Sequence, residues 1–392
     1  MVLTFALKRT DMVDTVDILY LTPNPGQRLL VTSDIHGYSH YLDAILRMAN
    51  FGGDDLLIVV GDLLDKGADS LGVLRRVMRL VQEGRCYAVW GNIDMWRYRR
   101  LRGALQSPDE AEHFYIEMME MNRMYGHDFF RELYREVGIA PTSGQEVFET
   151  LSIVAEHFKE ELAFLESLPT VIETPHYRFV HGGLPSPDAD ISEASPLSLM
   201  KYSWFLRTAR EKGMLFDKYT VVGHWPVSLN REDYSDSNPI TDHQTRIISI
   251  DGGCGVMLDG QLNLLVIPSF DAPVEACYHY SYDDFPPYTV QNDQIPADAS
   301  FFIHWHDDVV TVLEMDMDMA YVEHARTGYR MWVPVAYLYF PSPKEIAVGV
   351  SAKCRDCTDY RLPVKAGEVV SLVRKTSRGV MVKKNGISGW VD

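Results

Sequence analysis

The sequence is poor in cysteine and has no long hydrophobic run. Five cysteines among 392 residues are too few, and odd in number, for a disulfide framework, which favours a reducing compartment. No run approaches the roughly 20 apolar residues that a membrane-spanning helix needs. The opening segment carries its positive charges after a short apolar stretch, whereas a secretory signal carries them before it. We therefore expect a cytoplasmic protein with no membrane partner.

Positive charge is scarce as well. The chain has 37 lysines and arginines against 55 aspartates and glutamates, a formal net charge of −18. An acidic surface repels polyanions at long range, which argues against nucleic acid as a general partner. Cys354 and Cys357 form a lone C-x-x-C pair, and a structural zinc site needs four ligands. We interpret both cysteines as ordinary thiols.

The first part of the chain alternates between strand-like and helix-like segments. Strand-like runs occupy residues 28–33, 55–60 and 86–90, and helix-like stretches occupy residues 39–50 and 69–83. This alternation predicts an α/β fold with a parallel-rich sheet. The length of the chain leaves room for two or three domains.

Residues 95–168 interrupt the alternation and read as several helices, which predicts a helical insertion. Strand-like runs then resume at 177–181, 219–223, 246–250 and 263–267. After about residue 272 the chain becomes aromatic and proline-containing, and short β-like runs with turns follow.

The C-terminal region contains two segments that end alike, at residues 329–338 and 387–392. They resemble the closing strands of bacterial SH3-like barrels, which are small all-β domains. We therefore predict an α/β domain at residues 1–272 and SH3-like barrels at 273–342 and 343–392.

Five short motifs occur in order, each just after a strand-like run. They are S-D-I-H-G (33–37), G-D-L-L-D-K-G (61–67), G-N-I-D (91–94), H-G-G (181–183) and G-H-W (223–225). Ligands of open α/β sheets bind at the carboxyl ends of the strands. The five loops are therefore expected to meet at one rim and form a single site.

The motifs supply carboxylate, amide and imidazole donors. The candidate metal ligands are Asp34, His36, Asp62, Asn92, His181 and His224. Such a mixed set suits Mn, Fe or Zn, and one carboxylate, Asp62, can bridge two ions. Two ions about 3.5–4 Å apart clamp phosphoryl oxygens and lower the pKa of a bridging water. The pattern thus predicts a metal-dependent phosphoesterase.

The order of the motifs resembles that of the calcineurin-like metallophosphoesterases, in their phosphoprotein phosphatase (serine/threonine) branch, over about residues 28–270. The resemblance implies a four-layer α/β/β/α sandwich and two divalent metal ions. It implies that Asp34 and His36 hold the first ion and that Asp62 bridges. The second ion would be held by Asn92, His181 and His224. The implied reaction is attack of a metal-bridging hydroxide on a phosphorylated protein or a small phosphoester.

Other positions follow from the same resemblance. The segment K-Y-S-W-F-L-R before G-H-W is similar to the family's W-x-R segment, which would place Arg207 on the substrate phosphate. Lys66 stands where the family has arginine, and it can still attract phosphate as a point charge. Asp65, Asp94 and Arg207 are the candidate catalytic residues.

The sequence departs from the family at Ile93. The family has a histidine there, which protonates the leaving oxygen and which Asp65 would orient. Losing a general acid costs typically 10²–10⁴-fold in rate, and least for leaving groups that need no proton. Two alternatives therefore stay open: a phosphodiesterase or nucleotide hydrolase, and a weakly active metal-binding scaffold that acts through its SH3-like barrels on a peptide partner.

An arginine cluster follows the third motif. It consists of Arg97, Arg99, Arg100 and Arg102. These side chains could guide an anionic substrate, but four arginines within six residues cannot share one helical face. We interpret the cluster as a solvated helix face that is balanced by the acidic stretch 109–120.

Overall fold

Three parallel strands that follow each other in the sequence build the centre of the first sheet. They are β2 (Leu29–Thr32), β3 (Leu56–Val59) and β4 (Cys86–Ala88), and all but one of their residues are buried. β10 (Leu262–Ile267) lies antiparallel beside β2, and β11 (Tyr278–Tyr282) forms the edge next to β10. Continuous apolar runs suit such strands because both faces of the sheet are covered.

The second sheet has six strands, and its centre is also parallel, with β6, β7 and β9 side by side. In spatial order its strands are β1 (Ile18–Tyr20), β5 (Val171–Glu173), β6 (Tyr177–Val180), β7 (Tyr219–Val222), β9 (Ile247–Ser249) and β8 (Ile240–Asp242). The strand-like runs of the sequence coincide with β6, β7 and β9, whereas the sequence analysis does not predict β1, β5 and β8.

The two sheets pack face to face. Their shared core includes Val31 and Ile58 from the first sheet and Phe179, Val221 and Ile248 from the second. Helices α1 (Ser39–Met48) and α2 (Ser70–Gln82) cover the outer face of the first sheet. Helices α8 (Pro196–Met200) and α9 (Phe205–Lys212) cover the outer face of the second. The predicted α/β/β/α sandwich is confirmed.

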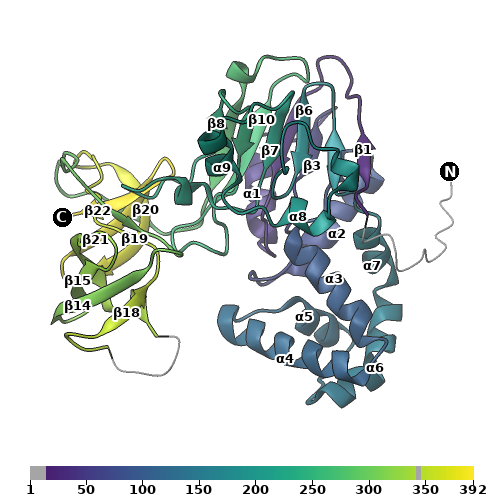
Figure 1. Ribbon diagram of the computed structural model, residues 1–392, viewed down its shortest axis with the longest axis horizontal. Helices are drawn as coiled ribbons and strands as arrows, with labels where there is room; N and C mark the ends of the chain where they lie inside the picture. Colours follow the sequence, from purple (N-terminus) through teal and green to yellow (C-terminus); the bar gives the residue numbers. More distant parts are fainter. Residues whose placement is uncertain (1–14, 341–345) are drawn as a thin grey trace. The chain divides into compact units, whose positions relative to one another are not determined.

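The predicted helical insertion is also present, as five helices. They are α3 (Asn92–Ala104), α4 (Pro108–Tyr125), α5 (Phe129–Glu136), α6 (Gly144–His157) and α7 (Lys159–Glu166) (Figure 1). Ser107, Asp128 and Ser143 cap the starts of α4, α5 and α6 by accepting backbone N–H bonds. The insertion begins three residues earlier than predicted, so that the motif residue Asn92 is the first residue of a helix.

This computed structural model describes residues 15–340 and 346–392, which form two compact units (Figure 1). The α/β unit comprises residues 15–225, 239–256 and 262–282. The β unit comprises the remaining described residues, including 226–238 and 257–261. None of the helices within the described ranges is long and apolar enough to cross a membrane.

The β unit confirms the predicted strand-rich C-terminal region. One sheet contains β12 (Pro287–Thr289), β20 (Val369–Thr376), β21 (Gly379–Lys384) and β22 (Ile387–Val391). A second contains β16 (Arg330–Pro334), β15 (Met319–His324), β14 (Val309–Asp316), β18 (Ser351–Cys354) and β17 (Leu338–Tyr339), and a third pairs β13 (Phe302–Ile303) with β19 (Cys357–Thr358). Because β12 pairs with β20, and β18 pairs with β14, strands are exchanged across the predicted boundary at residue 342. The division into two SH3-like barrels stays a prediction.

Candidate metal centre

The five motif loops follow the carboxyl ends of β2, β3, β4, β6 and β7, and direct hydrogen bonds bring them together across the two sheets. The backbone N–H of His224 donates to Asp34 Oδ2 (3.0 Å). The His181 ring donates from Nδ1 to the carbonyl oxygen of Val60 (2.7 Å). These two contacts join loops of the second sheet to loops of the first, so the motifs form one site, as their placement after the strands predicts.

Asp34, Asp62 and His181 form the centre of this site. All three are buried, and one ligand atom of each lies within 4.8 Å of the others. His181 Nε2 lies 3.4 Å from Asp62 Oδ2. His36 Nε2 lies 3.8 Å from Asp34 Oδ1 and 3.7 Å from Asp62 Oδ2. The His36 distances exceed ordinary hydrogen bonds, which reach about 3.2 Å, so His36 lies beside both carboxylates without a hydrogen bond to either.

The candidate ligand atom of the three motif histidines is Nε2. His36 and His181 each donate from Nδ1 to a backbone carbonyl, of Leu64 (3.1 Å) and Val60 (2.7 Å) respectively, which fixes the tautomer that metal ligands use. His224 Nε2 is buried and has no hydrogen-bond partner among the described residues. A buried polar atom without a partner costs about 1–3 kcal/mol, and a divalent cation would satisfy it. The donor set therefore fits such an ion.

Asn92 joins the centre through its side chain. Its Oδ1 lies 3.0 Å from His181 Nε2. The preceding Gly91 is the N-cap of α3, and a Cβ there would lie 2.0 Å from the backbone nitrogen of Asp62. Only glycine permits this approach, so the G-N motif positions Asn92 by bringing two loop backbones into contact.

The ligand loops hold several residues in a left-handed conformation. Asp34, His36, Asp62 and His224 have φ values of 53°, 48°, 54° and 66°. Such values are uncommon for residues other than glycine, and each costs on the order of 1–3 kcal/mol. Strain of this kind persists where the surrounding structure enforces it, and it gathers at functional sites.

Burial and mutual charge displace the pKa values of the central groups. Burial raises the pKa of Asp34 to about 6 and lowers the pKa of His36 and of His224 to about 3. Burial opposes ionisation of Asp62 and His181 too, but each favours the charge of the other. Their attraction lowers the pKa of Asp62 and raises that of His181 to about 10. His36 and His224 are thus kept neutral, which is the form in which an imidazole binds a metal, and Asp62 is kept ionised.

Lys66 adds a cation at the edge of this centre. Its Nζ lies 2.7 Å from His36 Nε2. Lys66 and the preceding Asp65 both have a φ of 67°, so the strained backbone extends through the second motif. The ammonium group is therefore next to the ligands, where a phosphate-binding role for Lys66 stays a prediction.

Asp65 contacts the helical insertion. One of its carboxylate oxygens accepts from Arg97 Nε, and the other accepts from the backbone N–H of Phe129 (3.0 Å). Arg97 also donates to Asp128 (2.8 Å), and all three charged side chains are buried. Both oxygens of Asp65 thus have donors, and none of these donors is a histidine.

The interpretation of the arginine cluster as a solvated face is wrong for Arg97, which is fully buried. Its partners Asp65 and Asp128 lie more than 30 positions away on either side. Arg97 falls on the buried stripe of α3 that includes Tyr98 and Leu101, and this helical spacing was the signal that could have identified it. Arg100 does pair with Glu110 and Glu117 of the acidic stretch, both at 2.6 Å.

Asp94 holds the loop that carries Asp62. Its Oδ1 accepts from the N–H groups of Leu63 (2.9 Å) and Leu64 (3.1 Å), and its Oδ2 accepts from that of Gly91 (3.3 Å). Burial raises the pKa of this carboxyl to about 7. These backbone contacts support a positioning role for Asp94.

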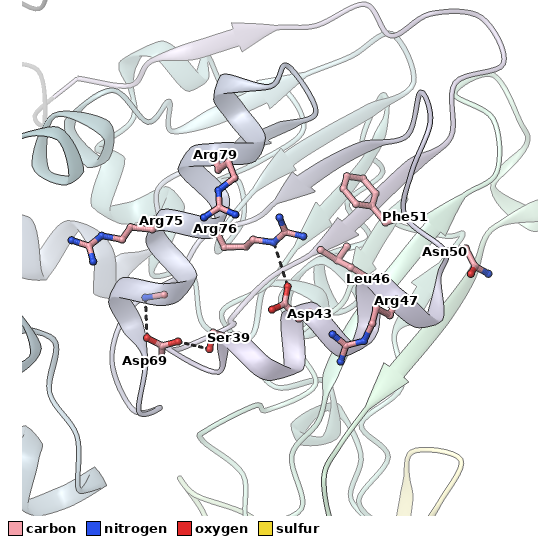
Figure 2. A pocket seen from close by; sticks show the side chains of 11 residues that line it. Ser39, Asp43, Leu46, Arg47, Asn50, Phe51, Asp69, Arg75, Arg76 and Arg79 are labelled. Atoms are coloured by element: carbon pink, nitrogen blue, oxygen red, sulfur yellow. Dashed lines mark hydrogen bonds and ion pairs between the residues drawn. The ribbon is translucent and has the colours of Figure 1, made fainter.

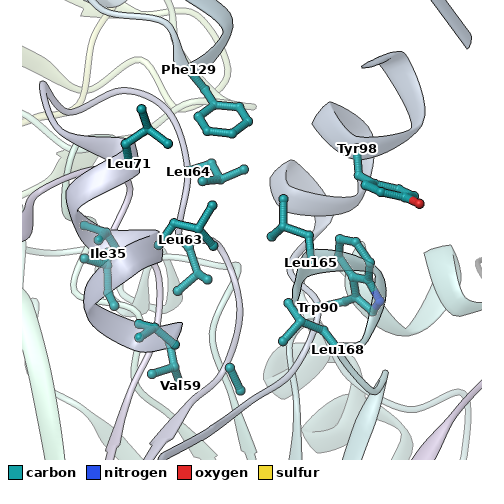
Figure 3. Close-up of a cluster of buried hydrophobic side chains, with 14 of the residues drawn as sticks. Ile35, Val59, Leu63, Leu64, Leu71, Trp90, Tyr98, Phe129, Leu165 and Leu168 are labelled. Carbon is teal, nitrogen blue, oxygen red and sulfur yellow. The ribbon is translucent and has the colours of Figure 1, made fainter. Parts of the chain in front are cut away.

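Ile93 contributes to the centre through its backbone alone. Its N–H donates to Asp62 Oδ1 (2.9 Å), while its side chain packs against the hydrophobic cluster that β3, α2 and the insertion share (Figure 3).

Asp251, which follows β9, is buried near Asp34: burial and then the charge of Asp34 raise its pKa well above the usual range.

Among the described residues Arg207 contacts Glu211 and Trp204, and the Trp204 ring packs on Trp225, which follows His224 (4.7 Å between ring centroids). Half of the Arg207 side chain is exposed, its Nε donates to Glu211 (3.0 Å), and its guanidinium lies over the ring of Trp204, 5.2 Å from the centroid. The phosphate-binding role of Arg207 therefore stays a prediction.

Two packed mixed sheets, helices on both outer faces and a buried carboxylate–imidazole centre at the strand ends define a metal-dependent phosphoesterase. The chain belongs to the calcineurin-like phosphoesterase family, whose model matches residues 27–254, more than half of the chain. Enzymes of this family are hydrolases that use divalent metal ions. Among curated proteins, none matches the sequence.

Solved structures of similar fold include enzymes of this kind. A candidate diadenosine tetraphosphatase is 20% identical, with a TM-score of 0.41, over 68% of this chain and 98% of its own. A serine/threonine phosphatase from Saccharomyces cerevisiae is 13% identical, with a TM-score of 0.40, over 71% and 87%. A metallophosphoesterase from Sphaerobacter thermophilus is 15% identical, with a TM-score of 0.35, over 66% and 89%. Identities this low bear on neither the substrate nor the roles of single residues.

Proposed function

We propose that this metallophosphoesterase removes phosphate from phosphoserine and phosphothreonine side chains of proteins. The observation that carries the proposal is the buried group of Asp34, Asp62 and His181, with the Lys66 ammonium beside it. The order of the ligands along the chain resembles that of the serine/threonine phosphoprotein phosphatases. The family itself implies a phosphorylated substrate.

We assign the first ion to Asp34, His36 and Asp62, and the second ion to Asp62 with three further ligands. Those ligands are Asn92, His181 and His224. When bound, the two ions, which we propose to be Mn²⁺, act as Lewis acids on the phosphoryl group and lower the pKa of water. Lys66 attracts the anionic substrate, and the backbone contacts of Asp94 keep the loop of Asp62 in place.

A second candidate function is hydrolysis of phosphodiesters or nucleotides. Ile93 cannot protonate a leaving group, and Asp65 contacts Arg97 and Phe129 rather than a histidine. An alkoxide leaving group needs a proton, whereas an aryl or phosphoryl leaving group needs it least. This arrangement favours substrates with a stable leaving group.

One comparison separates the candidates. Turnover of p-nitrophenyl phosphate, bis-p-nitrophenyl phosphate and a phosphoserine peptide is measured with Mn²⁺, with Asp62→Asn as the control. We expect monoester and peptide hydrolysis that the substitution abolishes. Faster turnover of the diester with no peptide hydrolysis would favour the second candidate. Metal binding without turnover of any ester would favour a metal-binding scaffold.

The proposal also covers a role for the β unit and a cellular location. We assign the C-terminal strands to SH3-like barrels that bind a peptide partner. We place the protein in the cytoplasm, a reducing compartment, and the five free cysteines support this.

A further inference from the structure

A groove lies between α1 and α2 on the outer face of the first sheet, and no role described so far uses it. Its volume is about 830 Å³. One stripe of each helix lines it (Figure 2). The lining residues of α1 and the turn after it are Ser39, Asp43, Leu46, Arg47, Asn50 and Phe51, and those of α2 and its N-cap are Asp69, Gly72, Arg75, Arg76 and Arg79.

Three arginines supply positive charge to this groove. Figure 2 shows Arg76 and Arg79 on the α2 side and Arg47 on the α1 side, whereas Arg75 turns away. Arg75 is engaged by two glutamates of the insertion, at 2.7 and 2.8 Å. Arg76 pairs with Asp43 across the groove (3.3 Å).

Arg47 and Arg79 are exposed, and neither has an ion pair among the described residues. Both lie in the last turn of their helix, where a cation interacts favourably with the helix dipole. The dipole accounts for one cation on each helix. It does not account for their gathering, with Arg76, in one concave surface of a chain whose net charge is −18.

The charges of the groove are ordered along its length. The end near the starts of both helices carries Asp69, the middle carries the ion pair of Asp43 and Arg76, and the last turns carry Arg47 and Arg79. The Asp69 end adjoins the ligand loops, because the N–H of Asp69 donates to the carbonyl of Gly37 (3.0 Å). A ligand that reaches from the metal centre into the groove therefore meets Asp69 first, the paired charges of Asp43 and Arg76 next, and the exposed positive charges last.

The apolar lining of the groove is small. It consists of Leu46, which is only 3% exposed, and the half-buried Phe51, whose ring lies under the guanidinium of Arg85. Helix α1 has 10 residues, or about 15 Å at a rise of 1.5 Å per residue, which an extended peptide of about five residues would span. Guanidinium groups that are spaced along a groove of this length suit a peptide segment with carboxylates better than a compact inorganic anion.

We infer that the α1–α2 groove binds an acidic segment of the phosphoprotein substrate, with its carboxylates on Arg47 and Arg79 and its neutral part beside Asp43. This inference rests on the proposed phosphoprotein phosphatase function. The groove would select substrates whose acidic residues are separated from the phosphorylated residue by a neutral spacer.

The test uses two phosphoserine peptides that differ only in having glutamates or glutamines beyond such a spacer. In the full-length protein with Mn²⁺, we expect kcat/KM to be higher for the glutamate peptide. The double variant Arg47→Glu, Arg79→Glu should lower that kcat/KM about tenfold, a difference of about 1.4 kcal/mol. Its kcat, its turnover of p-nitrophenyl phosphate and its kcat/KM for the glutamine peptide should stay unchanged. The preference should fall with added salt, which screens exposed charges.

The matched control is Arg123→Glu, Arg135→Glu, which makes the same change of charge at two exposed arginines of the insertion. Equal effects of the two double variants would show general electrostatics and overturn the inference, as would equal kcat/KM for the two peptides on the wild type. Circular dichroism checks that both variants are folded.

A binding measurement separates this inference from the proposed function. A fluorescent glutamate peptide without phosphate is titrated with wild type and with the groove variant. Weaker binding by the variant supports peptide binding in the groove, whether or not phosphopeptides are hydrolysed. Absence of phosphopeptide hydrolysis would contradict the proposed function but not the groove. Absence of binding to the wild type, or displacement of the peptide by equimolar inorganic pyrophosphate, would overturn the peptide assignment.

Discussion

Single residues set the geometry of the metal centre through their backbones as much as through their side chains. Six of the twelve non-glycine residues with positive φ in the described part of the chain lie in the ligand loops: Asp34, His36, Asp62, Asp65, Lys66 and His224. Their strain is maintained by contacts such as that between the loops of Gly91 and Asp62. These backbone contacts thus fix the positions of the ligands, which reduces the reorganisation that ion binding requires.

The close approach of Gly91 to Asp62 gives the first prediction. Gly91→Ala should weaken Mn²⁺ binding by at least about tenfold, because the new Cβ would lie 2.0 Å from the Asp62 nitrogen and would displace that loop. Isothermal titration calorimetry measures the affinity. Gly52→Ala is the control, since the nearest atom to a Cβ there is 3.8 Å away. Unchanged affinity in the Gly91 variant would show that the contact is not needed.

The candidate ligands were predictable at this scale because each lies within a few residues of a strand end, and a strand end is a local signal. Arg97 was not predictable in its role, because its partners lie 32 and 31 positions away in the sequence and only the tertiary fold brings them together. For Arg207 a short motif predicts a phosphate-binding role. Its side chain lies over Trp204 and donates to Glu211, and the role stays a prediction.

At the scale of elements, the buried ion pairs of Arg97 connect three of them. Arg97 belongs to α3, Asp65 to the loop after β3, and Asp128 to the N-cap of α5. Because α3 begins at Asn92, the pairs connect the insertion with two ligand loops. The insertion is therefore part of the framework of the site.

Removing this arginine should be costly. Arg97→Met leaves two carboxylates buried without their partner, so we expect a loss of about 3–5 kcal/mol in the free energy of unfolding. Urea denaturation measures it. Arg100→Met, which breaks partly exposed pairs, should cost about 1 kcal/mol or less. Equal costs for the two variants would contradict the role of burial.

A buried carboxyl group that contacts the start of α2 gives a prediction of how stability depends on pH. Glu132 of α5 accepts the N–H groups of Ser70 (3.1 Å) and Leu71 (3.0 Å), and burial raises its pKa from 4.5 to about 7. Between these values the folded protein binds more protons than the unfolded chain does. The stability contributed by this group is therefore complete below pH 4.5 and is lost as the pH rises through 7.

Glu132→Gln removes that titration. The free energy of unfolding of the wild type, minus that of the variant, should fall between pH 5 and pH 7 by at most about 1.4 kcal/mol per pH unit. Urea titrations at several pH values measure it. A difference that stays constant over this range would show that Glu132 is ionised throughout.

For the whole molecule, metal binding should stabilise the α/β unit more than the β unit, because the candidate ligands all belong to the former. At Mn²⁺ concentrations 100 times the Kd, the gain is about 2.7 kcal/mol, or roughly 5–10 °C in Tm. Scanning calorimetry with Mn²⁺ and with a chelator measures it. Asp62→Asn should show little of this shift, and an equal shift in that variant would place the ion elsewhere.

The architecture of the α/β unit followed from the sequence because strand-like runs that alternate with helix-like stretches indicate parallel strands. The arrangement of the β unit did not, because β12 pairs with β20 across some 80 positions and β18 pairs with β14 across about 40. Long-range strand pairing leaves little trace in local periodicity. The boundaries between units were hidden for the same reason, since residues 226–238 and 257–261 interrupt the α/β part of the chain.

These interruptions have a consequence for truncating the protein. Within the β unit, Ser237 donates to Gly386 (2.9 Å), Ser388 donates to Ser235 (3.0 Å), and Lys383 Nζ donates to the carbonyl of Asp259 (2.6 Å). A chain that ends after residue 282 would keep segments 226–238 and 257–261 but lose the C-terminal strands that form hydrogen bonds with them. The C-terminal region is therefore not a separable domain, because part of its unit is supplied by segments in the middle of the chain.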